Sequence, residues 1–159
     1  MDVFEFALEL EATGKAYYER LAAEANSSEL QDLFALLADA EQAHYDFLDA
    51  RKCDGPAVAS EGGILDRAKN IFQHLMETRE CHGVGLATID NDCYRMAIAA
   101  EEQSIRYYTD KAENEPSPEV RSLLQRLAAE EKVHLNIMEN VYEFVESPKY
   151  FLGGGSSAP

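Results

Sequence analysis

The sequence predicts an all-α protein, an antiparallel bundle of four helices with a long crossover between the second helix and the third. Apolar side chains recur at the i, i+3, i+4 and i+7 spacing of amphipathic helices in four long stretches of the chain. Two of the connections between these stretches are short, and only the middle one is long. Helices joined by short loops pack as antiparallel neighbours, so we expect two helix pairs.

The first pair is predicted over residues 3–25 and from about residue 28 to residue 50. In the first helix the apolar stripe includes Phe4 and Leu8, and in the second it includes Leu33 and Leu37. The intervening Asn26-Ser27-Ser28-Glu29 supplies N-cap candidates and an early negative charge, both of which favour the start of a helix.

The crossover is predicted from its helix-breaking residues. Gly55-Pro56 and Gly62-Gly63 interrupt the apolar periodicity after the second helix. A shorter helix is expected at residues 64–78, inside the crossover, before an irregular stretch around Gly83 and Gly85.

The second pair is predicted from about residue 90 to residue 114 and from residue 118 to residue 145. Ser117 is expected to be the N-cap of the last helix, with Pro118 at its first helical position. Residues 1–150 are expected to form one domain. The remaining segment, residues 151–159, is rich in Gly and Ser and is expected to be a flexible tail.

Composition excludes several partners and environments. The 159 residues include 30 acidic and 14 basic side chains, for a formal net charge of −16, so we expect no nucleic-acid partner. The apolar runs are shorter than the roughly 18 to 20 residues of a membrane span, and the sequence start lacks signal-peptide features. We therefore expect a cytoplasmic protein with no membrane partner. The cysteines, Cys53, Cys81 and Cys93, contain no Cys-x-x-Cys pair and are expected to be reduced and structural.

The two helix pairs repeat each other at an offset of 90 residues, which indicates an internal duplication. Matches between apolar residues are expected of any two bundle helices, but matches between Glu, Tyr and His residues are not. Identical residues stand 90 positions after each of Ala7, Glu11, Tyr17, Tyr18, Ala22, Ser27, Glu29, Leu33, Leu37, Ala38, Glu41 and His44.

Each pair offers one Glu on its first helix and a Glu-x-x-His motif on its second, and 30 residues separate the two glutamates in both pairs. Neighbours three, four and seven residues away share a helix face, and at these positions the glutamates and histidines have mostly apolar neighbours. We therefore expect six side chains to point into the core: Glu11, Glu41, His44, Glu101, Glu131 and His134.

Buried carboxylates require neutralisation, because each would cost several kcal/mol if it were left ionised and unpaired. Two divalent cations balance four carboxylates, and so do two ferric ions that share an oxo bridge. Oxygen ligands with one imidazole per metal suit iron or manganese, and zinc is a further substitute. The residues therefore predict a dinuclear metal site.

The segments around these residues resemble the ferritin-like superfamily and are most similar to its rubrerythrin branch. The resemblance covers about residues 3–145. It implies a ferritin-like bundle with a di-iron centre held by the six residues above, since one Glu from each of two helices with Glu-x-x-His from the other two is the superfamily's ligand pattern. The segments are EATGKAYY (11–18), ADAEQAH (38–44), EEQSIRYY (101–108) and AAEEKVH (128–134).

The resemblance also implies a function, that of a di-iron oxidoreductase that reduces hydrogen peroxide or dioxygen as ferrous iron is oxidised. Such a peroxidase would act against oxidative stress. Rubrerythrins proper carry a C-terminal rubredoxin domain, where this sequence has its Gly/Ser tail, so we expect an external electron donor such as a rubredoxin. They also have a glutamate three residues after the third-helix ligand, where this chain has Ser104. A homo-oligomer, at least a dimer, is expected, and the long crossover permits helix exchange between subunits.

Three other functions stay open. A ferroxidase that stores or transfers iron is favoured by Ser104 and by the tail in place of a rubredoxin domain. A metal-free structural bundle would have to satisfy its carboxylates by protonation and hydrogen bonds. A hydroxylase of an organic substrate is compatible with the same bundle, since fold does not fix function.

Tyr18 and Tyr108 are expected to support the chemistry. They lie seven residues after Glu11 and Glu101, on the same helix faces, so their hydroxyls are placed to orient ligand carboxylates. Tyr17 and Tyr107 point elsewhere and are expected to pack in the bundle.

Other polar residues near the motifs are expected to have no part in the site. Glu102 and Glu130 are adjacent to ligands but fall off their face, so solvated side chains are expected. His74 and the Cys81-His82 pair lie in the crossover, where nothing nearby completes a ligand set, and are expected to be structural or exposed.

Overall fold

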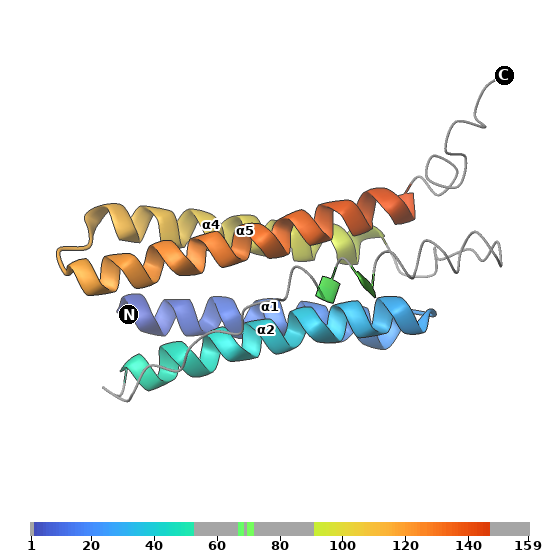
Figure 1. Cartoon of the computed structure of the whole chain (residues 1–159), viewed down its shortest axis with the longest axis horizontal. Helices are drawn as coiled ribbons and strands as arrows, with labels where there is room; N and C mark the ends of the chain where they lie inside the picture. The colour runs from blue at the N-terminus through green and yellow to red at the C-terminus, as the bar shows by residue number, and fades with distance from the viewer. Residues whose placement is uncertain (1, 53–66, 69, 72–90, 147–159) are drawn as a thin grey trace, which may run out of the picture.

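The computed structural model describes residues 2–52, 67–68, 70–71 and 91–146 (Figure 1). Within these ranges the chain forms helices and no strands, and no helix has the length and apolar composition of a membrane span. Figure 1 shows two antiparallel pairs packed as two layers, which confirms the predicted all-α bundle. The helices are α1 Val3–Glu24, α2 Ser28–Lys52, α4 Asn91–Asn114 and α5 Pro118–Glu146.

Polar side chains cap the beginnings of three helices. At α1, Asp2 Oδ1 accepts a hydrogen bond from the Glu5 backbone N–H at 2.9 Å, and the Glu5 carboxylate accepts one from the Asp2 N–H at 3.2 Å. Ser27 Oγ and Ser117 Oγ each accept from the backbone N–H three residues later, at 3.1 and 3.4 Å. Each cap satisfies a backbone donor that has no partner within the helix. The predicted N-cap at Ser117 is confirmed.

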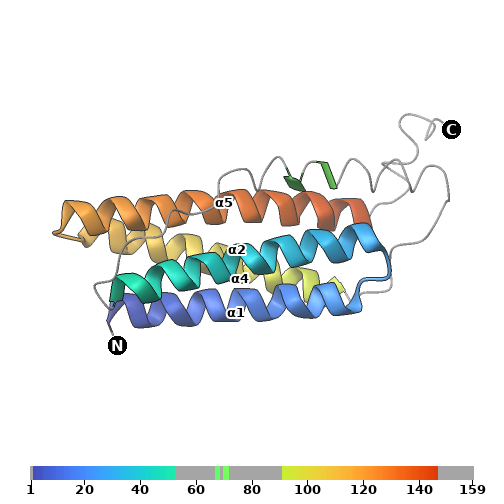
Figure 2. The ribbon, with the colours of Figure 1, turned by 60° about the horizontal axis from the view of Figure 1, so that its bottom comes forward.

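Helix α2 ends and helix α4 begins at opposite ends of the bundle. Figure 2 shows that α2 ends beside the beginning of α1, whereas α4 begins at the opposite end. The helix predicted at residues 64–78 is not confirmed as an element, because most of it lies outside the described residues; those described there, 67–68 and 70–71, have helical backbone. The tail predicted at 151–159 also lies outside them.

Two apolar clusters fill the bundle core on either side of a polar centre. One includes Phe34, Leu37 and Met138, all fully buried, and the other includes Ala7 and Leu48. Each buried Leu, Met or Phe side chain stabilises the fold by about 1.5 to 3 kcal/mol relative to an exposed one. The polar centre between the clusters is therefore shielded from water on two sides.

Candidate metal centre

All four helices contribute to a polar cluster at the middle of the bundle. Its members are at most 4% exposed, so the expectation that they point inward is confirmed. Helices α1 and α4 supply one carboxylate each, and α2 and α5 supply a carboxylate and an imidazole each. The cluster consists of Glu11, Glu41, His44, Glu101, Glu131 and His134.

The cluster divides into two overlapping groups, each with the composition of a metal site. One joins Glu11 and His44 to Glu41 and Glu131, and the other joins Glu101 and His134 to the same two glutamates. In each group the four potential ligand atoms lie within 4.8 Å of one another. Glu41 and Glu131 therefore stand between two neighbouring positions for an ion, an arrangement suited to carboxylates that bridge two metals.

Both histidines face the cluster with the same ring nitrogen. His44 Nδ1 lies 3.1 Å from Glu131 Oε1, and His134 Nδ1 lies 3.0 Å from Glu41 Oε1. Each imidazole thus contacts the shared glutamate of the other helix pair. The two rings stack with their centroids 5.5 Å apart and their planes 16° from parallel, so the two halves of the cluster mirror the sequence repeat.

The predicted supporting tyrosines bond ligand carboxylates across the bundle. Tyr18 donates its hydroxyl hydrogen bond to Glu101, and Tyr108 donates to Glu11 Oε1 at 2.6 Å. Burial, together with the nearby carboxylates, raises the pKa of both tyrosines well above the usual value. Their hydroxyls therefore keep their protons and act as hydrogen-bond donors.

Burial and neighbouring charge favour the protonated form of both shared carboxyls in the metal-free protein. Burial, followed by repulsion from the other carboxylates, raises the pKa of Glu41 well above its ordinary value. The same causes raise the pKa of Glu131 to about 8. Each of these groups would otherwise place a negative charge beside its neighbours in a medium of low dielectric.

The unshared carboxyls stay ionised and the imidazoles stay protonated. Burial acts to raise the pKa of Glu11, but the neighbouring Glu41 carboxyl and the His44 imidazole lower it to about 2. The pKa of Glu101 is lowered in the same way, against its burial, mainly by His134. Burial acts to lower the pKa of both histidines, and their carboxylate partners raise it well above 6.5. In the metal-free cluster these shifts favour protons on the shared carboxyls and on the imidazoles.

These donors fit a pair of divalent metal ions. Within the described part of the chain, Glu11 Oε2 is a fully buried acceptor with no hydrogen-bond partner, and it lies 3.4 Å from His44 Nδ1. A cation bound there would give this buried oxygen a direct partner. Carboxylate oxygens combined with one imidazole per ion suit iron or manganese.

A glycine leaves the space that one shared carboxyl occupies. Gly14 lies one turn after Glu11, and a Cβ at this position would stand 3.3 Å from Glu41 Cδ. The equivalent position of the second pair is Ser104, which is 7% exposed. Neither residue supplies a carboxylate, so the described cluster has four carboxylates rather than five.

Glu130 is the residue for which the sequence-based expectation was wrong. Its side chain is 28% exposed, and its Oε2 lies 3.0 Å from His44 Nε2. Glu130 falls off the ligand face of its own helix, as predicted, but α2 brings His44 against it. Periodicity describes one helix at a time, so it could not show this contact. Glu102, in contrast, is exposed as expected.

Cys93 is buried and its Sγ lies 3.7 Å from Glu24 Oε2, in agreement with a structural role. Tyr107 is partly buried against the apolar core, as expected of a packing residue. His74 and the Cys81-His82 pair lie outside the described residues.

Fold and cluster together define a class, the four-helix bundles with a buried carboxylate and histidine centre of dinuclear type. The sequence model of a protein family described as Rubrerythrin matches residues 57–149, more than half of the chain. The chain belongs to the rubrerythrin family, which is a ferritin-like di-iron family. No match was found among curated proteins or among solved structures. The matched range contains Glu101, Glu131 and His134, and the repeat supplies their counterparts from α1 and α2.

Proposed function

We propose that this protein is a non-haem di-iron oxidoreductase that reduces hydrogen peroxide or dioxygen with electrons from an external donor. The observation that supports it most directly is the pair of overlapping four-residue groups that share Glu41 and Glu131. A single metal site would not require two shared carboxylates with a histidine on each side. Membership of a ferritin-like di-iron family supports iron as the metal.

The residues would hold the two ions in equivalent ways. Glu11 and His44 would hold one, Glu101 and His134 the other, with the shared glutamates Glu41 and Glu131 between them. Two ferrous ions held there would supply one electron each, the two electrons that reduce peroxide to water or dioxygen to peroxide.

The chain itself would contribute orientation and the exclusion of water. Tyr18 and Tyr108 hold the unshared carboxylates by hydrogen bonds, so these ligands would not have to reorganise when an ion binds. The apolar clusters at both ends of the centre keep bulk water out and strengthen electrostatic interactions within it. A reductant would then act from outside the bundle.

The test is anaerobic reconstitution of the metal-free protein with ferrous iron, followed by metal analysis and by absorption spectra after addition of peroxide. About two irons per chain with rapid peroxide-driven oxidation, and repeated turnover with an external reductant, would support the proposal. Many irons per chain in a large assembly would replace it with the ferroxidase and storage alternative. Absence of bound metal after reconstitution would overturn both.

A further inference from the structure

His44 is held between the cluster and a carboxylate outside it. Its Nδ1 faces Glu131 and Glu11, at 3.1 and 3.4 Å, and its Nε2 faces Glu130 Oε2 at 3.0 Å. Glu130 belongs to α5, so this contact joins the second helix pair to a histidine of the first. The ring is therefore fixed at both nitrogens.

The surroundings of this contact favour a strong interaction. His44 and Glu130 line a small pocket between α2 and α5, of about 10 Å³, whose other walls are the apolar side chains of Phe47, Leu123 and Leu127 and the charged Arg126. Arg126 Nε lies 3.9 Å from Glu130 Oε1, whereas Oε2 is the oxygen that faces His44. Apolar walls reduce the screening of a charged hydrogen bond by water.

Among the described residues, the repeat gives the other half of the centre no counterpart of Glu130. At the offset of 90 residues that relates His44 to His134, the position equivalent to Glu130 is Ala40. A methyl group cannot accept a hydrogen bond from an imidazole. The six cluster residues are thus symmetric between the two halves, whereas the support of the two histidines is not.

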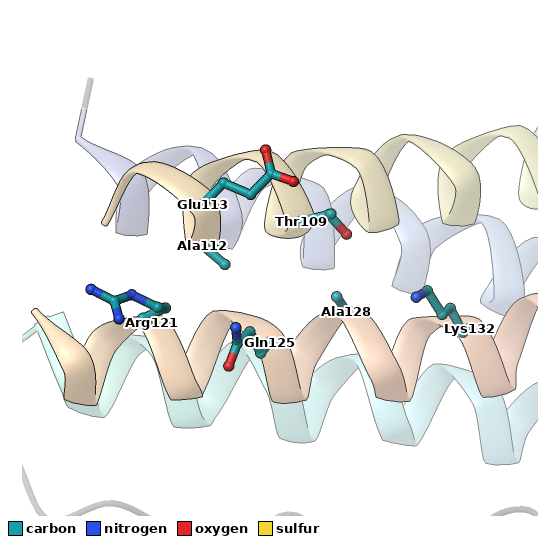
Figure 3. Close-up of a pocket in the computed structure, with 7 residues that line it drawn as sticks. All are labelled: Thr109, Ala112, Glu113, Arg121, Gln125, Ala128 and Lys132. Atoms are coloured by element: carbon teal, nitrogen blue, oxygen red, sulfur yellow. The ribbon is translucent and has the colours of Figure 1, made fainter. Parts of the chain in front are cut away.

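The second helix pair has a larger pocket, but this pocket is separate from the six cluster residues. It lies between α4 and α5, has a volume of about 490 Å³, and is lined by none of the six cluster residues (Figure 3). Its carboxylate, Glu113, is exposed and comes from the last turns of α4. Glu113 therefore offers a matched control for the loss of a carboxylate beside α5.

We propose that Glu130 is a positioning residue for His44 and makes the metal position of His44 the tighter of the two. The carboxylate accepts the Nε2 hydrogen, which keeps the Nδ1 lone pair directed at the metal and makes that nitrogen a stronger donor. The position of His134 lacks this support. This inference rests on the proposed metal pair and adds an order of filling to it.

The experiment is an equilibrium titration of the metal-free protein with Co²⁺, followed by absorption. The wild-type protein should bind two ions in two steps. Glu130→Ala should weaken the tighter step by about 10- to 100-fold, the usual effect of removing a carboxylate partner from a ligating histidine. Glu130→Gln keeps an acceptor oxygen, so it should weaken the tighter step less than Glu130→Ala does. Glu113→Ala should leave both steps unchanged.

Variants of the two histidines show which metal position gives the tighter binding step. In a His134→Ala background, Glu130→Ala should weaken the one remaining position, and in a His44→Ala background it should have no further effect. Ala40→Glu should strengthen the weaker step. Equal weakening of both steps by Glu130→Ala, or the same loss in both backgrounds, would overturn the inference while leaving the metal pair intact. Failure of wild-type protein to bind Co²⁺ would overturn the metal pair itself.

Discussion

Tyr18 of α1 donates its hydroxyl hydrogen bond to Glu101 of α4, the carboxylate of the other helix pair. Tyr108 of α4 returns the same contact to Glu11 of α1, at 2.6 Å. Each tyrosine follows one cluster glutamate by two helical turns and bonds the other. The two hydrogen bonds therefore join the duplicated halves at the centre itself and hold α1 and α4 in register.

Removal of either hydroxyl should destabilise the metal-free bundle. Tyr18→Phe removes the hydroxyl donor of the buried Glu101 carboxylate, and loss of a hydrogen bond to a charged group costs about 1.5 to 3 kcal/mol. We expect this fall in the free energy of unfolding, measured by urea denaturation, and a similar fall for Tyr108→Phe. Tyr17→Phe, next to the first site on the same helix, serves as the control. An equal loss in the control would contradict a specific role for the cross-bundle hydrogen bonds.

Loss of the shared carboxyls should abolish metal binding without unfolding the protein. In the double variant Glu41→Ala, Glu131→Ala both positions for an ion lose two of their four ligands, so added Co²⁺ or Fe²⁺ should no longer raise the melting temperature. Helicity by circular dichroism should stay near the wild-type value, because the variant removes two buried carboxyls whose ionisation burial and the other carboxylates oppose. Glu102→Ala removes an exposed carboxylate beside a ligand and is the control. Full metal occupancy in the double variant would refute the assignment.

The stability of the metal-free protein should fall as pH rises through neutrality. Burial and nearby carboxylates raise the pKa of Glu131 from 4.5 to about 8, so between these values the folded chain holds a proton that the unfolded chain has lost. His44 and His134, whose pKa values are raised well above 6.5, act in the same direction above pH 6.5. Melting temperatures measured from about pH 5 to about pH 9 should therefore decrease.

Bound metal should reverse this trend, because the ligands bind metal in their deprotonated forms. The increase in melting temperature on addition of Co²⁺ should grow with pH over the same range. A metal-free protein whose stability rises with pH would show that the folded cluster does not hold protons that the unfolded chain has lost.

Gly14→Ala should weaken metal binding. The gain of roughly 0.5 to 1 kcal/mol that alanine has over glycine in an open helix position is offset here by the contact with Glu41. The new Cβ would stand 3.3 Å from Glu41 Cδ, so the shared carboxyl has to shift by a few tenths of an ångström and should bind Co²⁺ more weakly. Thr13→Ala, an exposed substitution one residue earlier, should leave the affinity unchanged. Unaltered Co²⁺ affinity in Gly14→Ala would show that the carboxyl has room to move.

Most of the fold could be predicted because its signals are local. The four long helices agree with the predicted ranges to within a few residues, and Ser117 caps α5 where the sequence indicated. The inward direction of residues such as Glu11 and His134 follows from the helical period and needs no knowledge of the partner helix. The helix predicted at residues 64–78 stays a prediction, since most of it lies outside the described residues.

The contacts between helices could not be predicted in the same way. The spacing indicated that Tyr18 would reach a ligand carboxylate, but its partner is Glu101 rather than Glu11 of its own helix. The solvated role expected for Glu130 was wrong, because the packing of α2 against α5 places His44 within 3.0 Å of it.

The sequence by itself determined which residues enter the core, since the period of a helix fixes the face on which each side chain lies. The 90-residue repeat determined that this core contains two matched sets of one Glu and one Glu-x-x-His. The tertiary structure decided that Glu41 and Glu131 are the shared carboxyls, and that His44 has an outer carboxylate partner in Glu130. The physical reason is that contacts between helices depend on their relative rotation and register, which packing of the whole core sets.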